Sequence, residues 1–133
     1  MAPRSVHPLP PGSTIGIMGG GQLGRMTALA AARLGYKSHI FSPEDDSPGI
    51  QVSAAATIAD YQDRTALQSF AEAVDVVTFE FENVPADSAA FLADHALVRP
   101  GPQCLAIAQD RLLEKEFINK TAPTTPYRRV TSA

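Results

Sequence analysis

The sequence predicts an α/β fold in which a parallel sheet carries helices on both faces. Short apolar segments alternate with amphipathic segments along most of the chain, and a run of three glycines stands between the first apolar segment and the first helical one. Parallel strands need long crossovers, and in α/β proteins those crossovers are the helices that cover the sheet. The predicted order of elements is that of a Rossmann-like fold.

Length and composition are those of one globular domain. The 133 residues are 44% hydrophobic and 19% charged, and no run of about 18 apolar residues occurs, so neither disorder nor a membrane-spanning segment is expected. The net charge of −3 provides no basic field for a nucleic acid or an acidic lipid surface. Cys104 is the only cysteine, which excludes an internal disulfide and fits a reducing cytoplasm.

Four short apolar segments are typical of buried strands. They are residues 13–18, 37–41, 56–58 and 74–81, and a further short strand is expected at 97–98. Residues 42–49, which follow the second segment, are dense in turn-forming and acidic residues and predict a solvated loop. The segment 74–81 carries the strongest strand signal.

Apolar residues at helical spacing occupy the intervals between these strands. A helix is predicted over 22–34, with Gly35 as its C-terminal cap, and another over 64–73, with Asp63 as its N-cap. A third helix begins after Pro85. The apolar positions of the first helix are Leu23, Met26, Ala30 and Leu34, and those of the second are Leu67, Phe70 and Ala71.

The alternation of strands and helices ends near residue 101, and this divides the chain into three predicted parts. Residues 1–12 form a flexible leader, since prolines stand where a secretion signal has an apolar run. Residues 13–101 form the Rossmann-like domain. Residues 102–133 form a helical connector and linker toward a further domain, with one helix over 103–120 and with exposed apolar side chains.

The six residues Gly19–Gly24, of sequence GGGQLG, have the spacing G-x-G-x-x-G at a strand-to-helix junction. Glycines let the backbone turn sharply and approach a ligand, and the unpaired amides of Gln22, Leu23 and Gly24 at the helix start would face an anion such as phosphate. The plainer alternative is a turn that only allows the strand and the helix to pack closely.

Two other nucleotide-binding classes are less well supported. Arg25 and Met26 stand where a P-loop has Lys and Ser or Thr, so a P-loop NTPase is not expected. A nicotinamide-binding domain has an acid at the end of the second strand to hold the ribose hydroxyls, whereas here Ser42 is at that end and Glu44 follows two residues later.

The strand at 74–81 ends in alternating side chains, with Thr78, Glu80 and Glu82 on one face. A carboxylate inside a sheet covered on both faces is costly unless it is paired, so we expect Glu80 at the exposed carboxyl end of its strand. First and fourth strands can be neighbours at the switch point of such sheets, which would place the glycine loop and Glu80 in one crevice. A solvated polar face is the alternative.

No arrangement in the sequence indicates catalysis by this chain itself. The three histidines lack metal-ligand spacing, and neither a G-x-S-x-G elbow nor a Cys/His pair for nucleophilic catalysis is present. The charged run 110–116 has the composition of a solvated helix face.

Three stretches resemble the 5-(carboxyamino)imidazole ribonucleotide synthase family, ATP-grasp enzymes of purine biosynthesis. They are IMGGGQLGRM at 17–26, VTFEFENVP at 77–85, and QDRLLEKEF at 109–117 followed by APTTP at 122–126. Their order and spacing match from about residue 13 onward. GQLGRM together with EFEN is specific to this family among ATP-grasp relatives.

The resemblance implies a pre-ATP-grasp domain against which 5-aminoimidazole ribonucleotide lies. The implied substrate-binding residues are Gly21, Gln22, Leu23, Glu80, Glu82 and Asn83. Arg111 looks like the family arginine that reaches ATP. The resemblance further implies ATP and bicarbonate as co-substrates, a carboxyphosphate intermediate, Mg²⁺ on the ATP phosphates, and a homodimer at full length. This chain is expected to lack the ATP-grasp lobes, with their metal-binding acids, and to be inactive alone.

Two other classes stay open at this point. One is an NAD(P)-binding Rossmann domain of an oxidoreductase, for which Glu44 is the discriminating residue, because NAD recognition would lose its ribose anchor if Glu44 lay away from the glycine loop. The other is a non-enzymatic nucleotide-sensing module, which would require tight ligand binding by the chain alone.

Overall fold

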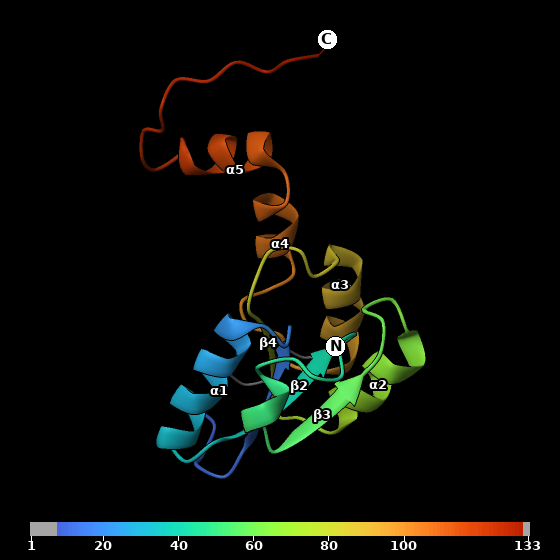
Figure 1. Ribbon diagram of the computed structural model, residues 1–133. Helices are drawn as coiled ribbons and strands as arrows, with labels where there is room; N and C mark the ends of the chain where they lie inside the picture. Colours follow the sequence, from blue (N-terminus) through green and yellow to red (C-terminus); the bar gives the residue numbers. More distant parts are fainter. Residues whose placement is uncertain (1–7, 132–133) are drawn as a thin grey trace.

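A four-stranded parallel sheet forms the centre of the computed structural model, which describes residues 8–131 (Figure 1). The strands lie in the order β3-β2-β1-β4, and each neighbouring pair is parallel. Their bounds are β1 Thr14–Met18, β2 Lys37–Ser42, β3 Ala55–Ile58 and β4 Val76–Phe79. A single parallel bridge from Val77 to Val98 forms at the position where a short fifth strand was expected.

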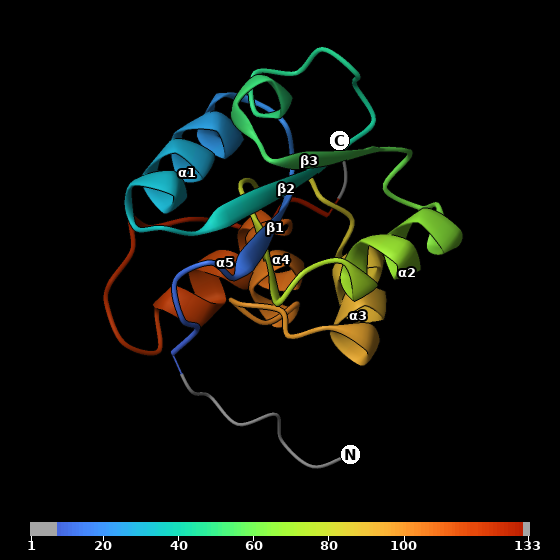
Figure 2. The same ribbon diagram turned by 90° about the horizontal axis from the view of Figure 1, so that it is seen from below.

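Helices cover both faces of this sheet, as the sequence predicts (Figure 2). The 3-10 turn η1 and helix α1 lie on one face, and α2 and α3 lie on the other. Their bounds are α1 Gln22–Arg33, η1 Ile50–Val52, α2 Arg64–Glu72, α3 Ala86–His95, α4 Gln103–Ala108 and α5 Arg111–Ile118. The predicted Rossmann-like α/β fold is therefore confirmed.

Two apolar cores, one on each face, hold the layers together. Ile17 and Ile40 pack with Ala28 of α1, whereas their neighbours Met18 and Phe41 belong to the larger cluster with α2 and α3. Side chains alternate between the faces of a strand, so adjacent apolar residues fill both cores. The adjacent apolar pairs at the ends of β1 and β2 meet this requirement.

Helix α1 packs on the sheet through a different face from the one predicted. Gly24, Ala28 and Ala31 are the buried residues of this helix. Leu23, Met26 and Leu34, which the spacing assigned to the core, are 55%, 64% and 69% exposed. Small side chains let the helix backbone approach the sheet closely, so they take the inner face and leave the larger apolar residues outside.

Strand β4 is shorter than the predicted 74–81. It pairs with β1 only from Ile15↔Val76 to Met18↔Phe79, so both strands end together. The last backbone bond of this ladder runs from the Glu80 amide to the Met18 carbonyl. Alternation therefore does not continue to Glu82, and the chain turns immediately after Glu80.

The predicted single helix over 103–120 is two helices, α4 and α5. Asp110 separates them, because its carboxylate accepts hydrogen bonds from the Leu112 and Leu113 amides at 2.9 and 3.0 Å and so caps a new helix. The expected exposure of apolar side chains is confirmed: Leu113, Phe117 and Val130 are 48%, 53% and 80% exposed. No residue of α5 is buried.

The predicted leader falls partly outside the described residues, which begin at residue 8. Within the described part, Leu9 accepts a hydrogen bond from the Tyr36 hydroxyl at 2.8 Å, and the Gly12 amide donates to Gly35 at 2.7 Å. None of the helices in the described part of the chain has the length and hydropathy needed to cross a membrane.

Candidate functional site

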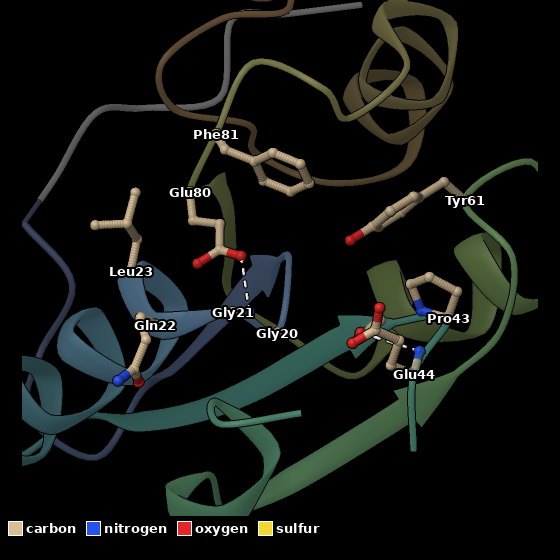
Figure 3. A pocket seen from close by; sticks show the side chains of 10 residues that line it. Gly20, Gly21, Gln22, Leu23, Pro43, Glu44, Tyr61, Glu80 and Phe81 are labelled. Atoms are coloured by element: carbon tan, nitrogen blue, oxygen red, sulfur yellow. Dashed lines mark hydrogen bonds between the residues drawn. The ribbon is translucent and has the colours of Figure 1, made fainter. Parts of the chain in front are cut away.

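A cavity of about 430 Å³ opens at the carboxyl edge of the sheet, beside the ends of β1 and β4 (Figure 3). Strand order reverses between these two strands, and ligands of open α/β sheets bind in the crevice at such a switch point. The cavity is lined by Gly20, Gly21, Gln22, Leu23, Ser42, Pro43, Glu44, Tyr61, Glu80 and Phe81.

Glu80 joins the end of β4 to the glycine loop after β1. Its Oε1 accepts a hydrogen bond from the Gly21 amide at 2.9 Å, and its Oε2 accepts one from the Gly24 amide. The prediction that Glu80 and the glycine loop share a crevice is confirmed. The prediction that the Gly24 amide faces an external anion is wrong, because the Glu80 carboxylate is already the anion at this amide.

Glycine is required at two positions of the loop for separate reasons. Gly19 has a φ of +114°, and a Cβ there would lie 2.4 Å from Cγ of Glu80. At Gly20 a Cβ would lie 2.1 Å from the hydroxyl oxygen of Ser47 and 2.9 Å from that of Ser42. Ser47 is buried and its hydroxyl has no hydrogen-bond partner in the described structure. The loop is therefore closely enclosed from both sides.

Gln22 and Leu23 carry the amides that remain open for a ligand at the start of α1. Within residues 8–131 neither amide has a hydrogen-bond partner, whereas the Arg25 amide already bonds to the Gly21 carbonyl. Amides at a helix N-terminus favour negative charge, and both residues line the cavity. The anion-binding capacity predicted for this helix start thus rests on two amides instead of three.

Glu44, Tyr61 and Phe81 form the wall opposite the helix start (Figure 3). The Tyr61 ring stacks on Phe41 with centroids 5.9 Å apart, and its hydroxyl points into the cavity toward Glu80. Burial, followed by the negative charges of Glu80 and Glu44, raises the pKa of Tyr61 to about 12. The phenol is therefore a neutral hydrogen-bond donor near pH 7.

Three of the predicted site residues lie outside this cavity. Glu82 and Asn83 are exposed in the turn after Glu80, and neither lines it. Arg111 lines another cavity, of about 370 Å³, together with Lys115 and Arg128. The Arg111 side chain is 75% exposed and forms an ion pair with Glu114.

The charges in the cavity restrict its ligands. Two carboxylates line it, and none of its lining residues is Lys or Arg. In the part of the chain that the structure describes, His, Cys, Asp and Glu side chains form no group of three that could hold a metal ion. The cavity thus offers acceptors for hydroxyls or an amine, and helix amides for one anionic group.

Tyr61 and Phe81 are lining residues that sequence reasoning missed, and Glu44 was considered only for NAD. Tyr61 follows β3 by three residues, so the carboxyl-end rule could have found it, but the third strand had a weak sequence signal. The expected alternation along this strand placed Phe81 on the face opposite Glu80. Strand β4 ends at Phe79, however, so the alternation stops there and Phe81 lines the cavity. Glu44 lies in the same cavity as Gly20 and Gly21. The position of Glu44 alone therefore does not exclude an NAD(P)-binding domain.

The fold and the site together define a Rossmann-like α/β domain, with a glycine loop and a carboxylate meeting at the switch point. The family model of the ribonucleotide synthetase pre-ATP-grasp domain matches residues 13–109, and the chain belongs to this family. The resemblance stated from the sequence is confirmed, and membership of this family disfavours both the oxidoreductase and the sensing-module alternatives.

Several similar proteins are N5-carboxyaminoimidazole ribonucleotide synthases. N5-carboxyaminoimidazole ribonucleotide synthase of Brucella melitensis is 53% identical over 123 residues, which cover 92% of this chain and 34% of that protein. An N5-carboxyaminoimidazole ribonucleotide synthetase crystallised with ADP is 47% identical, with a TM-score of 0.81 over 84% of this chain and 30% of its own.

The synthase of Aspergillus clavatus, in complex with ADP and 5-aminoimidazole ribonucleotide, is 31% identical with a TM-score of 0.71, covering 82% of this chain and 29% of its own. This chain therefore spans about a third of the length of these three relatives.

Proposed function

We propose that this chain is the ribonucleotide-binding part of an N5-carboxyaminoimidazole ribonucleotide synthase, with 5-aminoimidazole ribonucleotide as its ligand. One observation carries the proposal: in a chain of this family, Glu80 and the open amides of α1 face the same cavity of about 430 Å³. A cavity of this size suits a small phosphorylated ligand.

In this proposal the ligand lies across the cavity with its phosphate toward the helix. The amides of Gln22 and Leu23 anchor the phosphate, because they are open and the helix N-terminus favours an anion. Glu80 accepts a hydrogen bond from the amine, and Gly21 lets the backbone approach the ribose. Glu82 and Asn83, exposed in the next turn, contact the ribonucleotide from outside the cavity.

The complete reaction uses parts beyond the described cavity. We propose that ATP phosphorylates bicarbonate to carboxyphosphate, and that the amine then takes the carboxyl group and releases phosphate. Arg111, exposed at the start of α5, contacts ATP. Mg²⁺ on the ATP phosphates is part of the proposal, but the described residues offer no group of ligands for it, and we assign none of them to it.

The proposal extends to assembly and location. A protein of the relatives' length is expected to form a homodimer, supported by the row of exposed apolar side chains on α1 and measurable by light scattering. A cytoplasmic location is supported by the single cysteine, which is free.

Binding is tested by titrating the 133-residue chain with 5-aminoimidazole ribonucleotide and following backbone amides by NMR. The Gln22 and Leu23 amides should shift on titration, because they would bind the phosphate. Amides of α5 should stay unchanged, because ATP and not the ribonucleotide is assigned to Arg111. Shifts confined to α5, or no shifts at all, would contradict the proposal.

Activity is tested by ADP release from a protein that contains this chain at the relatives' full length. ADP release should depend on both bicarbonate and 5-aminoimidazole ribonucleotide. The 133-residue chain alone should release none. ADP release by the short chain would overturn the assignment of catalysis to residues outside it.

A further inference from the structure

We propose that Tyr61 is a specificity-determining residue of the cavity, and that its hydroxyl donates a hydrogen bond to the unsubstituted ring nitrogen of the aminoimidazole. The inference rests on the proposed function, since it concerns how the same ligand is recognised. Sequence reasoning assigned no role to Tyr61, whereas its position in the cavity assigns one.

The Tyr61 ring is held in a fixed orientation. It is half-buried and stacks on Phe41 at 5.9 Å with an interplanar angle of 26°. Phe41 is fully buried and packs edge-on against Phe70 at 5.3 Å. An aromatic stack of this kind fixes the ring, so the hydroxyl occupies one place in the cavity (Figure 3).

The hydroxyl of Tyr61 has no hydrogen-bond partner within the described residues, although it lies in a cavity with two carboxylates. Its proton is retained near pH 7, since the ordinary pKa of 10.0 is already well above neutrality and burial, followed by the charges of Glu80 and Glu44, raises this pKa to about 12. A fixed and protonated phenol is therefore available as a donor to a ligand.

The donors and acceptors of the cavity match those of the ring. An aminoimidazole that carries ribose on one ring nitrogen presents an amine, which donates, and a second ring nitrogen, which accepts. Glu80 supplies an acceptor on one side, and the Tyr61 hydroxyl points toward it from the opposite wall (Figure 3). Ser42 is buried beside the glycine loop, and Gln22 lies at the helix start, on the phosphate side.

A phenol suits this ring nitrogen better than a cationic donor would. It donates a hydrogen bond without transferring its proton, so the ring stays neutral. A protonated ring would withdraw electrons from the amine, which must attack the carboxyl group. Lys and Arg are absent from the lining of the cavity, in agreement with this requirement.

The test compares Tyr61→Phe with the unchanged 133-residue chain in NMR titrations with 5-aminoimidazole ribonucleotide and with ribose 5-phosphate. Tyr61→Phe keeps the ring and removes only the hydroxyl. It should weaken binding of the aminoimidazole ribonucleotide about 5- to 15-fold, the effect of one lost hydrogen bond. Binding of ribose 5-phosphate, which has no imidazole ring, should change less than about twofold.

Tyr36→Phe is the matched control, because the Tyr36 hydroxyl donates to the Leu9 carbonyl and Tyr36 does not line the cavity. Its affinity for both ligands should equal that of the unchanged chain. Equal weakening of both ligands by Tyr61→Phe would show a role in cavity shape or phosphate binding and would overturn the inference, as would no weakening of either. If the unchanged chain binds no aminoimidazole ribonucleotide, the proposed function fails and the inference fails with it.

Discussion

Glu80 supports the glycine loop and also lines the cavity. Both of its carboxylate oxygens accept amide hydrogens from the loop, at Gly21 and Gly24. A carboxylate has about four acceptor positions, so these two bonds leave room for a ligand amine. The same side chain can therefore hold the loop in shape and contact the ligand.

Glu80→Gln should destabilise the fold, because one carboxylate oxygen becomes an NH₂ group that faces a loop amide donor. The half-buried position predicts a loss of about 1–2 kcal/mol in the free energy of unfolding, measured in urea. Glu82→Gln, at an exposed neighbour, should change it by less than about 0.5 kcal/mol. Equal losses in the two variants would mean that the Glu80 bonds to the loop add no stability.

The burial of His39 predicts that the stability of the fold depends on pH. Its ring bonds to the Thr57 hydroxyl at 2.8 Å and lies edge-on against Phe70 at 5.0 Å. Burial lowers the pKa of His39 below its ordinary value of 6.5, so below that pH the unfolded chain binds a proton that the folded chain does not. The stabilisation is complete above 6.5 and is lost as the pH falls below it.

The free energy of unfolding, measured in urea from about pH 7.5 to pH 5, should therefore decrease toward the acid side. His39→Gln should show a smaller decrease over the same range. An identical pH profile for His39→Gln and the unchanged chain would exclude His39 as its source.

At the scale of elements, substitutions on the two faces of α1 should lower the free energy of unfolding by different amounts. Ala28 is 1% exposed and packs on Ile17 and Ile40, so Ala28→Leu should overfill this contact and cost about 1–3 kcal/mol of unfolding free energy. Leu29→Gln, on the 45% exposed side of the helix, should cost less than about 0.5 kcal/mol. Thermal and urea unfolding measure both. A larger loss from Leu29→Gln would mean that the outer face is covered.

Elements whose pattern is local could be predicted from the sequence. Helix α2 has its predicted cap, Asp63, and its predicted buried residues, Leu67, Phe70 and Ala71. The face of α1 could not be predicted in this way, because alanine suits either face and the closeness of the sheet decides between them. The break at Asp110 was missed because the apolar spacing continues across it.

The site was predictable to the extent that it follows from strand order. The meeting of the glycine loop with Glu80 needs only that β1 and β4 be neighbours. The hydrogen bonds from the loop amides to the Glu80 carboxylate depend on how this side chain is oriented at the end of β4. No local sequence pattern predicts that orientation. Tyr61 follows β3, which lies two strands from β1 in the sheet. Its place in the cavity could therefore be predicted only from the complete strand order.

At the scale of the whole molecule, α4 and α5 extend from the α/β unit (Figure 1). Leu105 of α4 is buried in the larger core, and the Gln109 side chain donates to the carbonyls of Glu82 and Val84 at 2.6 and 2.7 Å. These carbonyls belong to the turn that follows Glu80. The connector is thus joined to the segment that ends at the proposed binding cavity.

Gln109→Ala should loosen this attachment without unfolding the sheet. Losing both hydrogen bonds to the turn removes about 2 kcal/mol, so amide hydrogen exchange in α4 should accelerate about 30-fold. Amides of β1 should exchange as in the unchanged chain, since they open only with the whole fold. Gln103→Ala, an exposed control at the start of α4, should leave both rates unchanged. If β1 accelerated as much as α4 in Gln109→Ala, the connector and the sheet would unfold as one unit, and the separate behaviour inferred for residues 103–118 would be wrong.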